Sequence, residues 1–254
     1  MIDLTLIGIG TGNPEHVTLE AVKAMNSVDL ILIPLKGEDK ADLAGLRHEI
    51  CRNCITNPAV RIETFDLPVR DPETPDYLRR VKDWHDEIAA VWATVIAGHL
   101  AQDGGAKVAF LVWGDPSLYD STLRIAERLG RRMPLRLKVI PGITAIQTLC
   151  AAHGIPLNDL AAPVAITTGR RLRETGWPEG AATAVVMLDG GCEFAALDPA
   201  GVAIWWGAYV GMQNQILLSG SLAEMSDLIV QTRANARAEH GWIMDIYLMR
   251  RTIP

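Results

Sequence analysis

Short apolar runs alternate with amphipathic stretches through the first half of this 254-residue chain, and this alternation limits the possible folds more than any other feature. Residues 3–9 and 28–33 are apolar runs of strand length, and the stretch between them has the spacing of an amphipathic helix. Further strands are expected at 60–65, 108–113 and 136–140, with helical stretches between them. Because parallel strands need a crossover connection that is usually a helix, this order predicts a parallel α/β sheet.

The pattern changes after Pro156, where strand candidates follow one another closely. They lie at 164–168, 184–188, 202–206, 216–219 and 242–249. One clear helix, at 222–238, separates the last two, which is typical of a mixed α+β sheet. We therefore predict an N-terminal α/β domain over residues 1–154 and a C-terminal mixed-sheet domain over residues 155–254.

The charge and composition of the chain argue against several classes of function. Thirty acidic and 24 basic residues give a formal charge of −6, whereas a general nucleic-acid binder is expected to be basic. The longest apolar runs, such as residues 29–35, are far shorter than the ~20 residues that a membrane helix needs. The start of the chain, residues 1–10, is typical of a first strand and lacks the basic region of a signal peptide. We therefore expect a cytoplasmic protein that binds neither nucleic acid nor a membrane.

The four cysteines are too few for a disulfide framework in a chain of this length. Cys51 and Cys54 form a C-x-x-C motif, but Cys150 and Cys192 are isolated and distant in the sequence. A structural zinc site normally has four ligands, and a thioredoxin-like motif would follow a strand, whereas this one ends a predicted helix. The sequence predicts no metal site.

Three glycine-containing turns follow predicted strands of the first half. They are the segments 8–14, 113–117 and 141–144. In two of them a polar residue precedes proline, at Asn13-Pro14 and Asp115-Pro116, which predicts a capped helix start. Because parallel strands end at one edge of their sheet, we expect the turns to meet where open α/β sheets bind ligands.

The residues of these turns favour a ligand without a phosphate chain. The first turn fails the dinucleotide-binding spacing, because Asn13 stands where glycine or alanine is required. The sequence contains no P-loop motif, and none of the three turns contains lysine or arginine. A ligand held through backbone groups, with its adenine in an apolar slot, fits better. The alternative that these are ordinary tight turns stays open at this point.

Four segments, in this order and spacing, resemble the tetrapyrrole (corrin/porphyrin) methyltransferases. They are GIGTGNPEHVTLEAVKAM, VDLILI, VWGDPSLYDSTLRI and VIPGITAIQTLCAAHGIPL. The likeness continues through VAITTGR, VVMLDG and WWGAYVGMQNQILLSGSL, so it covers nearly the whole chain. Two positions depart from the family pattern: its G-x-G-P-G-D turn is here Gly10-Thr11-Gly12-Asn13, and its charged residue beside the C-domain glycine is Trp206.

This resemblance implies a two-domain fold with a ligand cleft between the domains, and S-adenosylmethionine (SAM) as the methyl donor, with S-adenosylhomocysteine as its product. The insert LPVRDPETPDYLRRVKDWHDEIA and the WWGAYVG segment most resemble members that methylate C1 of precorrin-5 and release acetate in aerobic cobalamin biosynthesis. A tetrapyrrole substrate is then implied. Two alternatives stay open: another family member, acting on a different tetrapyrrole position or on a macromolecule, or a nucleotide binder.

The resemblance also implies which residues contact SAM. They are Thr11, Trp113, Gly114, Asp115, Leu118, Thr144 and Ala145 in the first domain, and Leu188 and the turn Gly207-Ala208 in the second. Two leucines of this set would supply the apolar walls that a purine needs. For Asp115 the alternative is a helix cap alone.

Two histidines are candidates for the base that acetate release requires. Methyl transfer depends mainly on positioning, whereas release of an acyl group by water needs a proton acceptor. His16 follows the first glycine-rich turn, at the expected ligand edge. His85 lies on the apolar face of a long helix predicted at 77–100, where packing is the competing explanation. We favour His16.

A substrate rich in carboxylates requires local cations or polar groups. The candidates are Arg70, Tyr119, Arg170 and Arg171. Solvent exposure alone is the competing explanation for the arginines. Trp205 and Trp206 are adjacent, so in a strand they point to opposite faces, and a partner chain would bury one of them. With the family resemblance, this predicts a homodimer.

Overall fold

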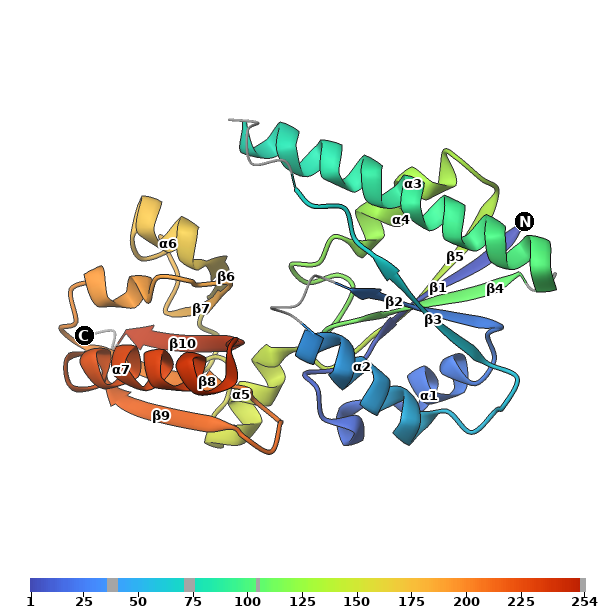
Figure 1. The fold of residues 1–254 in the computed structure, drawn as a ribbon. Helices are drawn as coiled ribbons and strands as arrows, with labels where there is room; N and C mark the ends of the chain where they lie inside the picture. The colour runs from blue at the N-terminus through green and yellow to red at the C-terminus, as the bar shows by residue number, and fades with distance from the viewer. Residues whose placement is uncertain (36–40, 71–75, 104–105, 252–254) are drawn as a thin grey trace. The chain divides into compact units, whose positions relative to one another are not determined.

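The computed structural model describes residues 1–35, 41–70, 76–103 and 106–251. The chain forms two compact units, residues 1–144 and 145–254, each of which is described by itself (Figure 1). The predicted boundary after residue 154 lies one helix later. Helix α5 (Ala145–His153) belongs to the second unit because it packs on strands β8 (Val202–Ala208) and β10 (Asp245–Arg251) of that unit.

The first unit is built on a parallel sheet with the strand order β3-β2-β4-β1-β5. The strands are β1 (Ile2–Gly8), β2 (Leu30–Leu35), β3 (Arg61–Asp66), β4 (Lys107–Val112) and β5 (Leu135–Ile140). Each observed strand overlaps its predicted range, and the predicted parallel α/β architecture is confirmed. The connections from β1 to β2 and from β4 to β5 run in opposite directions across the sheet, so the point of reversal lies between the adjacent strands β1 and β4.

Helices cover both faces of this sheet (Figure 1). One face packs against α3 (Tyr77–Asp103) and α4 (Thr122–Gly130), and the other against α1 (Leu19–Met25) and α2 (Ala41–Cys54). The side chains of strand β1 alternate between the two faces. Leu4 and Leu6 pack on the side of α3 and α4, and Ile7 packs on the side of α1 and α2. All three are fully buried, which contributes about 1.5–3 kcal/mol for each side chain.

The long helix α3 uses the apolar stripe that its sequence predicts. Ile88, Trp92 and Ile96 recur every four residues and are at most 3% exposed. Trp92 stacks on Phe110 of β4, with ring centroids 3.8 Å apart and an interplanar angle of 20°. This contact anchors the middle of α3 to the centre of the sheet.

The second unit is built on a mixed sheet with the order β6-β7-β10-β8-β9, which confirms the predicted change of architecture. Only the pair β6 and β7 is parallel. The strands are β6 (Val164–Thr168), β7 (Thr183–Met187), β8 (Val202–Ala208), β9 (Ile216–Ser221) and β10 (Asp245–Arg251). Helices α6 (Gly169–Thr175) and α7 (Leu222–His240), with a 3₁₀ helix at Glu193–Ala196, complete the unit.

The adjacent tryptophans of β8 point to opposite faces, as predicted. Trp206 is fully buried in the core of its own unit, so it needs no partner chain to cover it. Trp205 is half-buried on the other face, where the guanidinium of Arg250 lies 5.3 Å from its ring centroid.

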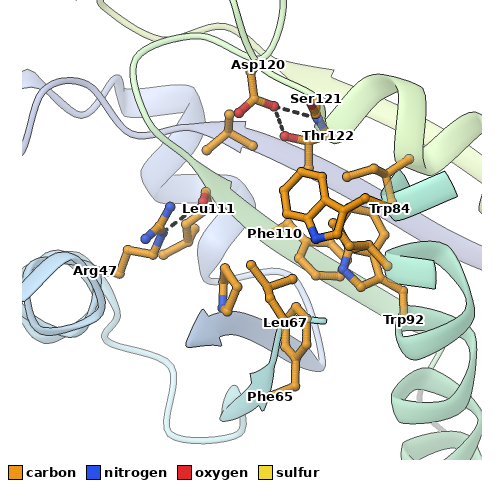
Figure 2. Close-up of a pocket in the computed structure, with 14 residues that line it drawn as sticks. Arg47, Phe65, Leu67, Trp84, Trp92, Phe110, Leu111, Asp120, Ser121 and Thr122 are labelled. Carbon is orange, nitrogen blue, oxygen red and sulfur yellow. Dashed lines mark hydrogen bonds between the residues drawn. The ribbon is translucent and has the colours of Figure 1, made fainter. Parts of the chain in front are cut away.

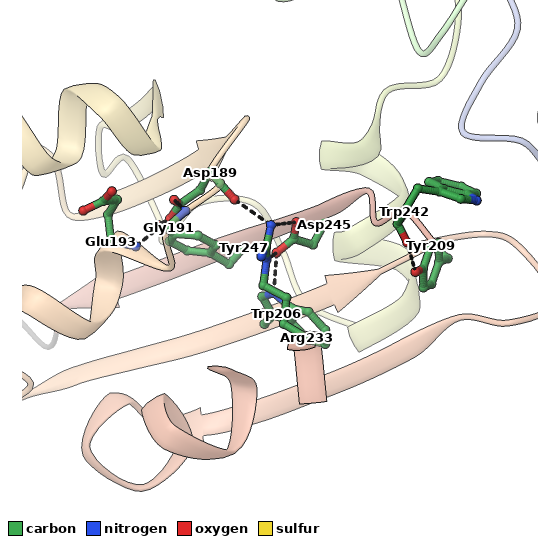
Figure 3. Close-up of polar contacts among 9 residues, drawn as sticks. All are labelled: Asp189, Gly191, Glu193, Trp206, Tyr209, Arg233, Trp242, Asp245 and Tyr247. Carbon is green, nitrogen blue, oxygen red and sulfur yellow. Dashed lines mark hydrogen bonds and ion pairs between the residues drawn. The ribbon is translucent and has the colours of Figure 1, made fainter. Parts of the chain in front are cut away.

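A buried polar network crosses the second unit (Figure 3). Arg233 of α7 forms a salt bridge with Asp245 of β10, with Nε and Oδ2 2.9 Å apart and side chains only 12% and 8% exposed. The same Oδ2 accepts a hydrogen bond from Trp206 Nε1 at 3.1 Å. Asp189 accepts a hydrogen bond from the Tyr247 hydroxyl at 2.6 Å, and its carbonyl accepts one from Arg233 at 3.2 Å. The network therefore ties α7 and the loop after β7 to the centre of the sheet.

Breaking this buried ion pair is expected to destabilise the second unit. Arg233→Met leaves the carboxylate of Asp245 buried without its cation, which typically costs about 3–5 kcal/mol. The exposed Arg237 on the same helix provides a matched control, and Arg237→Met should change the free energy of unfolding by no more than about 0.5 kcal/mol. Urea denaturation followed by circular dichroism measures both, and equal midpoints for the two variants would contradict the prediction.

Candidate functional site

The three glycine-containing turns meet at the carboxyl edge of the parallel sheet, as predicted. The N–H of Gly114 donates to the carbonyl oxygen of Gly10 at 2.7 Å, and these residues form an isolated antiparallel bridge. The third turn joins them through Asp115, whose Oδ2 accepts a hydrogen bond from the Gly142 N–H at 2.9 Å. Residues separated by more than a hundred positions in the sequence are thereby held in one cluster, which we call the turn cluster (residues 8–14, 113–117 and 141–144).

Two glycines of the turn cluster leave no space for a side chain. A Cβ on Gly142 would lie 2.1 Å from the carbonyl oxygen of Gly114, and a Cβ on Gly8 would lie 2.6 Å from the backbone nitrogen of Gly142. The obstructing atoms belong to the backbone, so no side-chain rotation relieves the overlap. Gly114 has a different requirement, a positive φ of 59°, with ordinary contacts around a hypothetical Cβ.

The predicted helix start at Asp115-Pro116 is wrong. Helix α4 begins at Thr122, and the carboxylate of Asp115 instead accepts hydrogen bonds from the N–H and hydroxyl of Ser117 and from Gly142. Burial acts to raise the pKa of Asp115, but these hydrogen bonds outweigh it and lower the pKa below the ordinary value. The residue is therefore an anion at neutral pH that joins two turns.

The predicted helix start at Asn13-Pro14 is confirmed for a short 3₁₀ helix, Pro14–His16. The Asn13 side chain caps it by accepting a hydrogen bond from the Glu15 N–H at 2.9 Å. Helix α1 begins separately, at Leu19, with Thr18 as its cap.

Buried polar atoms at the turn cluster lack partners among the described residues. They are Thr11 Oγ1, Trp113 Nε1 and His16 Nδ1. A buried donor or acceptor without a hydrogen bond costs about 1–3 kcal/mol, which favours a bound group that supplies the missing partners. Thr11 and Trp113 are two of the residues predicted to contact SAM, so the site's donors and acceptors fit a polar ligand.

Two other predicted SAM contacts, Thr144 and Leu118, lie at or beside the same turns in the first unit, and Ala145 begins the second unit. Thr144 is buried, and its Cα lies 3.6 Å from the position of a Cβ on Gly114. Leu118 is half-buried two residues after Pro116, and its N–H donates to the Asp115 carbonyl at 3.2 Å. Ala145 is the first residue of α5.

In the second unit, Leu188 lies in the loop directly after a strand. Gly207 and Ala208 lie within a strand and not in the predicted turn. Leu188 directly follows β7, has a positive φ of 53° and is 69% exposed. Gly207 and Ala208 instead end strand β8, because Ala208 still pairs with Asp245 of β10 and with Ile216 of β9. The turn begins one residue later, at Tyr209, with a φ of 51°.

The two candidate bases lie in different surroundings. His16 ends the 3₁₀ helix and packs on the turn cluster, with its Cβ 3.1 Å from the position of a Cβ on Gly10. His85 is 3% exposed on α3, beside the ring of Trp84. Burial lowers the pKa of His85, and nearby arginines lower it further, so its ring is neutral at pH 7.

The four predicted substrate contacts are divided between the two units. The guanidinium of Arg70 lies 4.4 Å from the ring centroid of Trp84. Tyr119 is 44% exposed, with a φ of 48°, one residue before Asp120. Arg170 and Arg171 lie on α6 of the second unit, where Arg171 pairs with Glu174 at 3.8 Å.

Sequence reasoning missed Arg47 of α2, a charged residue that is only 7% exposed. Its Nε donates to the Leu111 carbonyl of β4 at 3.2 Å, and its guanidinium lies 5.0 Å from the ring centroid of Trp113. The signal was available in the sequence, because Arg47 shares the helix face of the apolar Ala44 and Cys51.

Within residues 1–35, 41–70, 76–103 and 106–251, none of the helices has the length and hydropathy that a membrane span requires. Within the same ranges, no group of three or more His, Cys, Asp or Glu residues is arranged to hold a metal ion. Cys51 and Cys54 are buried free thiols at the end of α2.

Comparison with known proteins gives a family match over most of the chain. The family model described as Tetrapyrrole (Corrin/Porphyrin) Methylases matches residues 3–226. Over 253 residues, covering 99% of this chain and 96% of the relative, the sequence is 48% identical to a protein from a Sinorhizobium species named precorrin-6A synthase (deacetylating). A second protein from that genus, named precorrin-2 C(20)-methyltransferase, is 31% identical over 67% of this chain and 69% of its own length.

Solved structures agree with this match. A cobalamin synthesis related protein (CobF) from Corynebacterium diphtheriae aligns with a TM-score of 0.83 and 38% identity, covering 99% of both chains. A uroporphyrin-III C-methyltransferase from Thermus thermophilus, in complex with S-adenosyl homocysteine, aligns with a TM-score of 0.58 over 98% of this chain and 97% of its own. Its 17% identity shows the shared fold alone.

The backbone contact at Gly142 leads to a prediction about the stability of the first unit. Gly142→Ala forces two turns apart and should lower the free energy of unfolding by about 3 kcal/mol, near the upper end of typical overpacking costs. Gly98 in α3 has open space around it, so Gly98→Ala should raise the same quantity by about 0.5–1 kcal/mol. Denaturant unfolding measures both, and a Gly142→Ala protein as stable as the unaltered chain would contradict the contact.

Proposed function

The chain belongs to the tetrapyrrole (corrin/porphyrin) methylase family, and we propose that it is a SAM-dependent C-methyltransferase of aerobic cobalamin biosynthesis that methylates precorrin-5 at C1 and releases acetate. The product is then precorrin-6A. The observation that carries this proposal is the 48% identity, over 99% of the chain, to the Sinorhizobium protein named precorrin-6A synthase (deacetylating). The 38% identity to the CobF structure, over 99% of both chains, supports it.

The turn cluster supports SAM as the methyl donor. The three turns offer backbone N–H and carbonyl groups and contain no lysine or arginine, which a pyrophosphate ligand would favour. The anionic Asp115 instead adds negative charge to this edge, which suits a cationic sulfonium. The Thermus relative's complex with S-adenosyl homocysteine agrees with this choice.

The roles of individual residues in this site are part of the proposal. Thr11 and Trp113 would bond polar groups of the cofactor, and Gly114 would let it approach the backbone closely. Leu118, Thr144 and Ala145 would form the wall beside it. Leu188, Gly207 and Ala208 stay predicted contacts from the second unit, and Arg70, Tyr119, Arg170 and Arg171 stay predicted contacts of the substrate.

The two chemical steps make different demands on the protein. When bound, SAM supplies an electrophilic methyl group, and the chain's task is to hold it in line with the ring carbon in a site that excludes water. Acetate release needs a residue that takes a proton from the attacking water. We assign that role to His16, since it packs on the turn cluster and its buried Nδ1 has no partner among the described residues.

A second candidate function is methylation of a different precorrin position. The 31% identity to the precorrin-2 C(20)-methyltransferase supports the shared chemistry, but it extends over only 67% of the chain. The full-length match to the deacetylating relative favours C1.

One experiment tests the function directly. The purified protein is incubated with SAM and an enzyme system that generates precorrin-5, and the products are identified by mass. We expect one added methyl group, the loss of the acyl group and one equivalent of acetate. A methylated tetrapyrrole that keeps its acyl group, without acetate, would favour the second candidate.

A cytoplasmic homodimer remains part of the proposal. Trp206 is buried within its own unit, which leaves Trp205 on the other face as the tryptophan that a partner chain would cover, and the family resemblance supports the same expectation. Light scattering at micromolar concentration should give about twice the chain mass of 27.7 kDa. A mass of one chain would contradict it.

Replacing His16 should separate the two chemical steps. General-base catalysis typically contributes about 10²–10⁴-fold, so His16→Ala should release acetate at least about a hundredfold more slowly. SAM affinity, measured by calorimetry, should stay near that of the unaltered protein. His48→Ala, on α2, serves as the control and should keep the full rate of release. Unchanged acetate release by His16→Ala would transfer the role to another residue.

A further inference from the structure

A pocket of about 100 Å³ lies beside the carboxyl ends of β2, β3 and β4 in the first unit (Figure 2). Aromatic side chains form one part of its lining, from Phe65, Trp84, Trp92 and Phe110. Arg47 lies on the opposite side, and Asp120, Ser121 and Thr122 line it at the start of α4. No residue role proposed above uses this pocket.

The aromatic wall is held by ring contacts. Phe110 stacks on Trp92 and receives the edge of Phe65, with centroids 6.0 Å apart and planes at 85°. A wall of packed rings keeps its shape and offers contacts to a methyl group. The pocket is therefore preformed on its apolar side.

The polar side carries one cation and one anion. Arg47 is held by its hydrogen bond to the Leu111 carbonyl. Asp120 is held by Thr122, whose N–H donates to Oδ1 at 2.6 Å and whose hydroxyl donates to the same oxygen. Burial lowers the pKa of Arg47 to about 10 while the nearby Asp120 acts to raise it, so Arg47 is a cation at neutral pH. Among the described residues that line the pocket, Arg47 is the basic one and Asp120 the acidic one.

The pocket adjoins the turn cluster. Val112 lines it, and the next residue, Trp113, is one of the proposed SAM contacts. The guanidinium of Arg47 lies over the Trp113 ring, so one side chain borders both places. Helix α2, which carries Arg47, also packs against the 3₁₀ helix that ends at His16.

We propose that this pocket holds the acyl group that the tetrapyrrole substrate loses, with Arg47 facing its carbonyl oxygen. The inference rests on the proposed function. A volume of about 100 Å³ is that of about three water molecules, enough for a two-carbon acyl group and far too small for the macrocycle. The methyl group of the acyl unit would pack against the aromatic rings, and its carbonyl oxygen would point toward the Arg47 guanidinium.

Acyl release would proceed by hydrolysis of the bond between the acyl carbon and the macrocycle. The oxygen of a water molecule attacks the acyl carbon, and one water proton passes to the base, for which His16 is proposed. The bond between the acyl carbon and the macrocycle then breaks, and its electron pair stays on the conjugated ring. Acetate leaves after losing the second proton. Arg47 stabilises the negative charge that develops on the acyl oxygen, as oxyanion-hole donors do.

A carboxylate side chain of the tetrapyrrole is the competing occupant. The pocket already holds Asp120, so a second carboxylate would leave two anions facing one cation. A neutral acyl group avoids this excess of negative charge. The two occupants also differ in kinetics, because a carboxylate anchor affects binding of the whole substrate, whereas an acyl site affects the release step.

Filling the pocket tests the assignment. Ser121 lines it, and its side chain makes no cap hydrogen bond to α4, so Ser121→Leu adds bulk there without removing such a bond. We expect acetate release to slow by about a hundredfold, because the added side chain would displace the reacting acyl group. The SAM affinity should stay within about twofold of that of the unaltered protein. Glu127→Leu places the same side chain on the exposed face of α4 and should keep the full rate.

Arg47→Lys provides a second variant that retains the positive charge but loses the planar guanidinium. It should slow acetate release by about a hundredfold with little change in the KM for the tetrapyrrole. Thermal melting confirms that each variant is folded. A raised KM with an unchanged rate of release would establish a carboxylate anchor instead and overturn the assignment.

The outcomes separate the two proposals. Release of acetate at the unaltered rate by folded Ser121→Leu would overturn the acyl pocket alone. Failure of the unaltered protein to release acetate would overturn the proposed function, and the acyl pocket with it.

Discussion

The close packing of backbone at Gly8, Gly114 and Gly142 is the constraint on which the candidate site depends. Each of these turns follows a different strand, and the sheet order β4-β1-β5 places the three strand ends side by side. Without side chains at Gly8 and Gly142, the turns approach to van der Waals contact, and the Asp115 carboxylate can bond the Gly142 N–H. The result is a rigid edge whose exposed chemistry is mostly backbone, which suits a ligand recognised by shape and hydrogen bonds.

Arg47 in the first unit and Arg233 in the second are both largely buried, and the two are used differently. Arg233 lies between α7 and β10, bonded to Asp245 and to the Asp189 carbonyl, and these contacts connect parts of the second unit. Arg47 donates to the Leu111 carbonyl of β4 and lines the pocket, which places its guanidinium where the proposed acyl group would bind.

The sequence predicts the order of elements well because apolar periodicity reports which face of each element is buried. It fails where a residue's partner is distant in the chain. Asp115-Pro116 has the local pattern of a helix start, but the partner that decides its role is Gly142, 27 residues away. Gly207 and Ala208 were expected in a turn because the pairing of Ala208 with Asp245 of β10 cannot be read from β8 alone. For Arg47 the sequence shows a position on the apolar face of its helix, but its acceptor, Leu111, is 64 residues away and cannot be read from that pattern.

The end of β4 explains how one site can serve two chemical steps. In the proposed reaction one substrate undergoes both methyl transfer and acyl release, so adjacent subsites with a fixed separation would serve both steps. Val112 lines the pocket, Trp113 follows it at the turn cluster, and Arg47 contacts both the Leu111 carbonyl and the Trp113 ring. Because Val112 and Trp113 are consecutive at the end of β4, the backbone would set the spacing of the two proposed subsites.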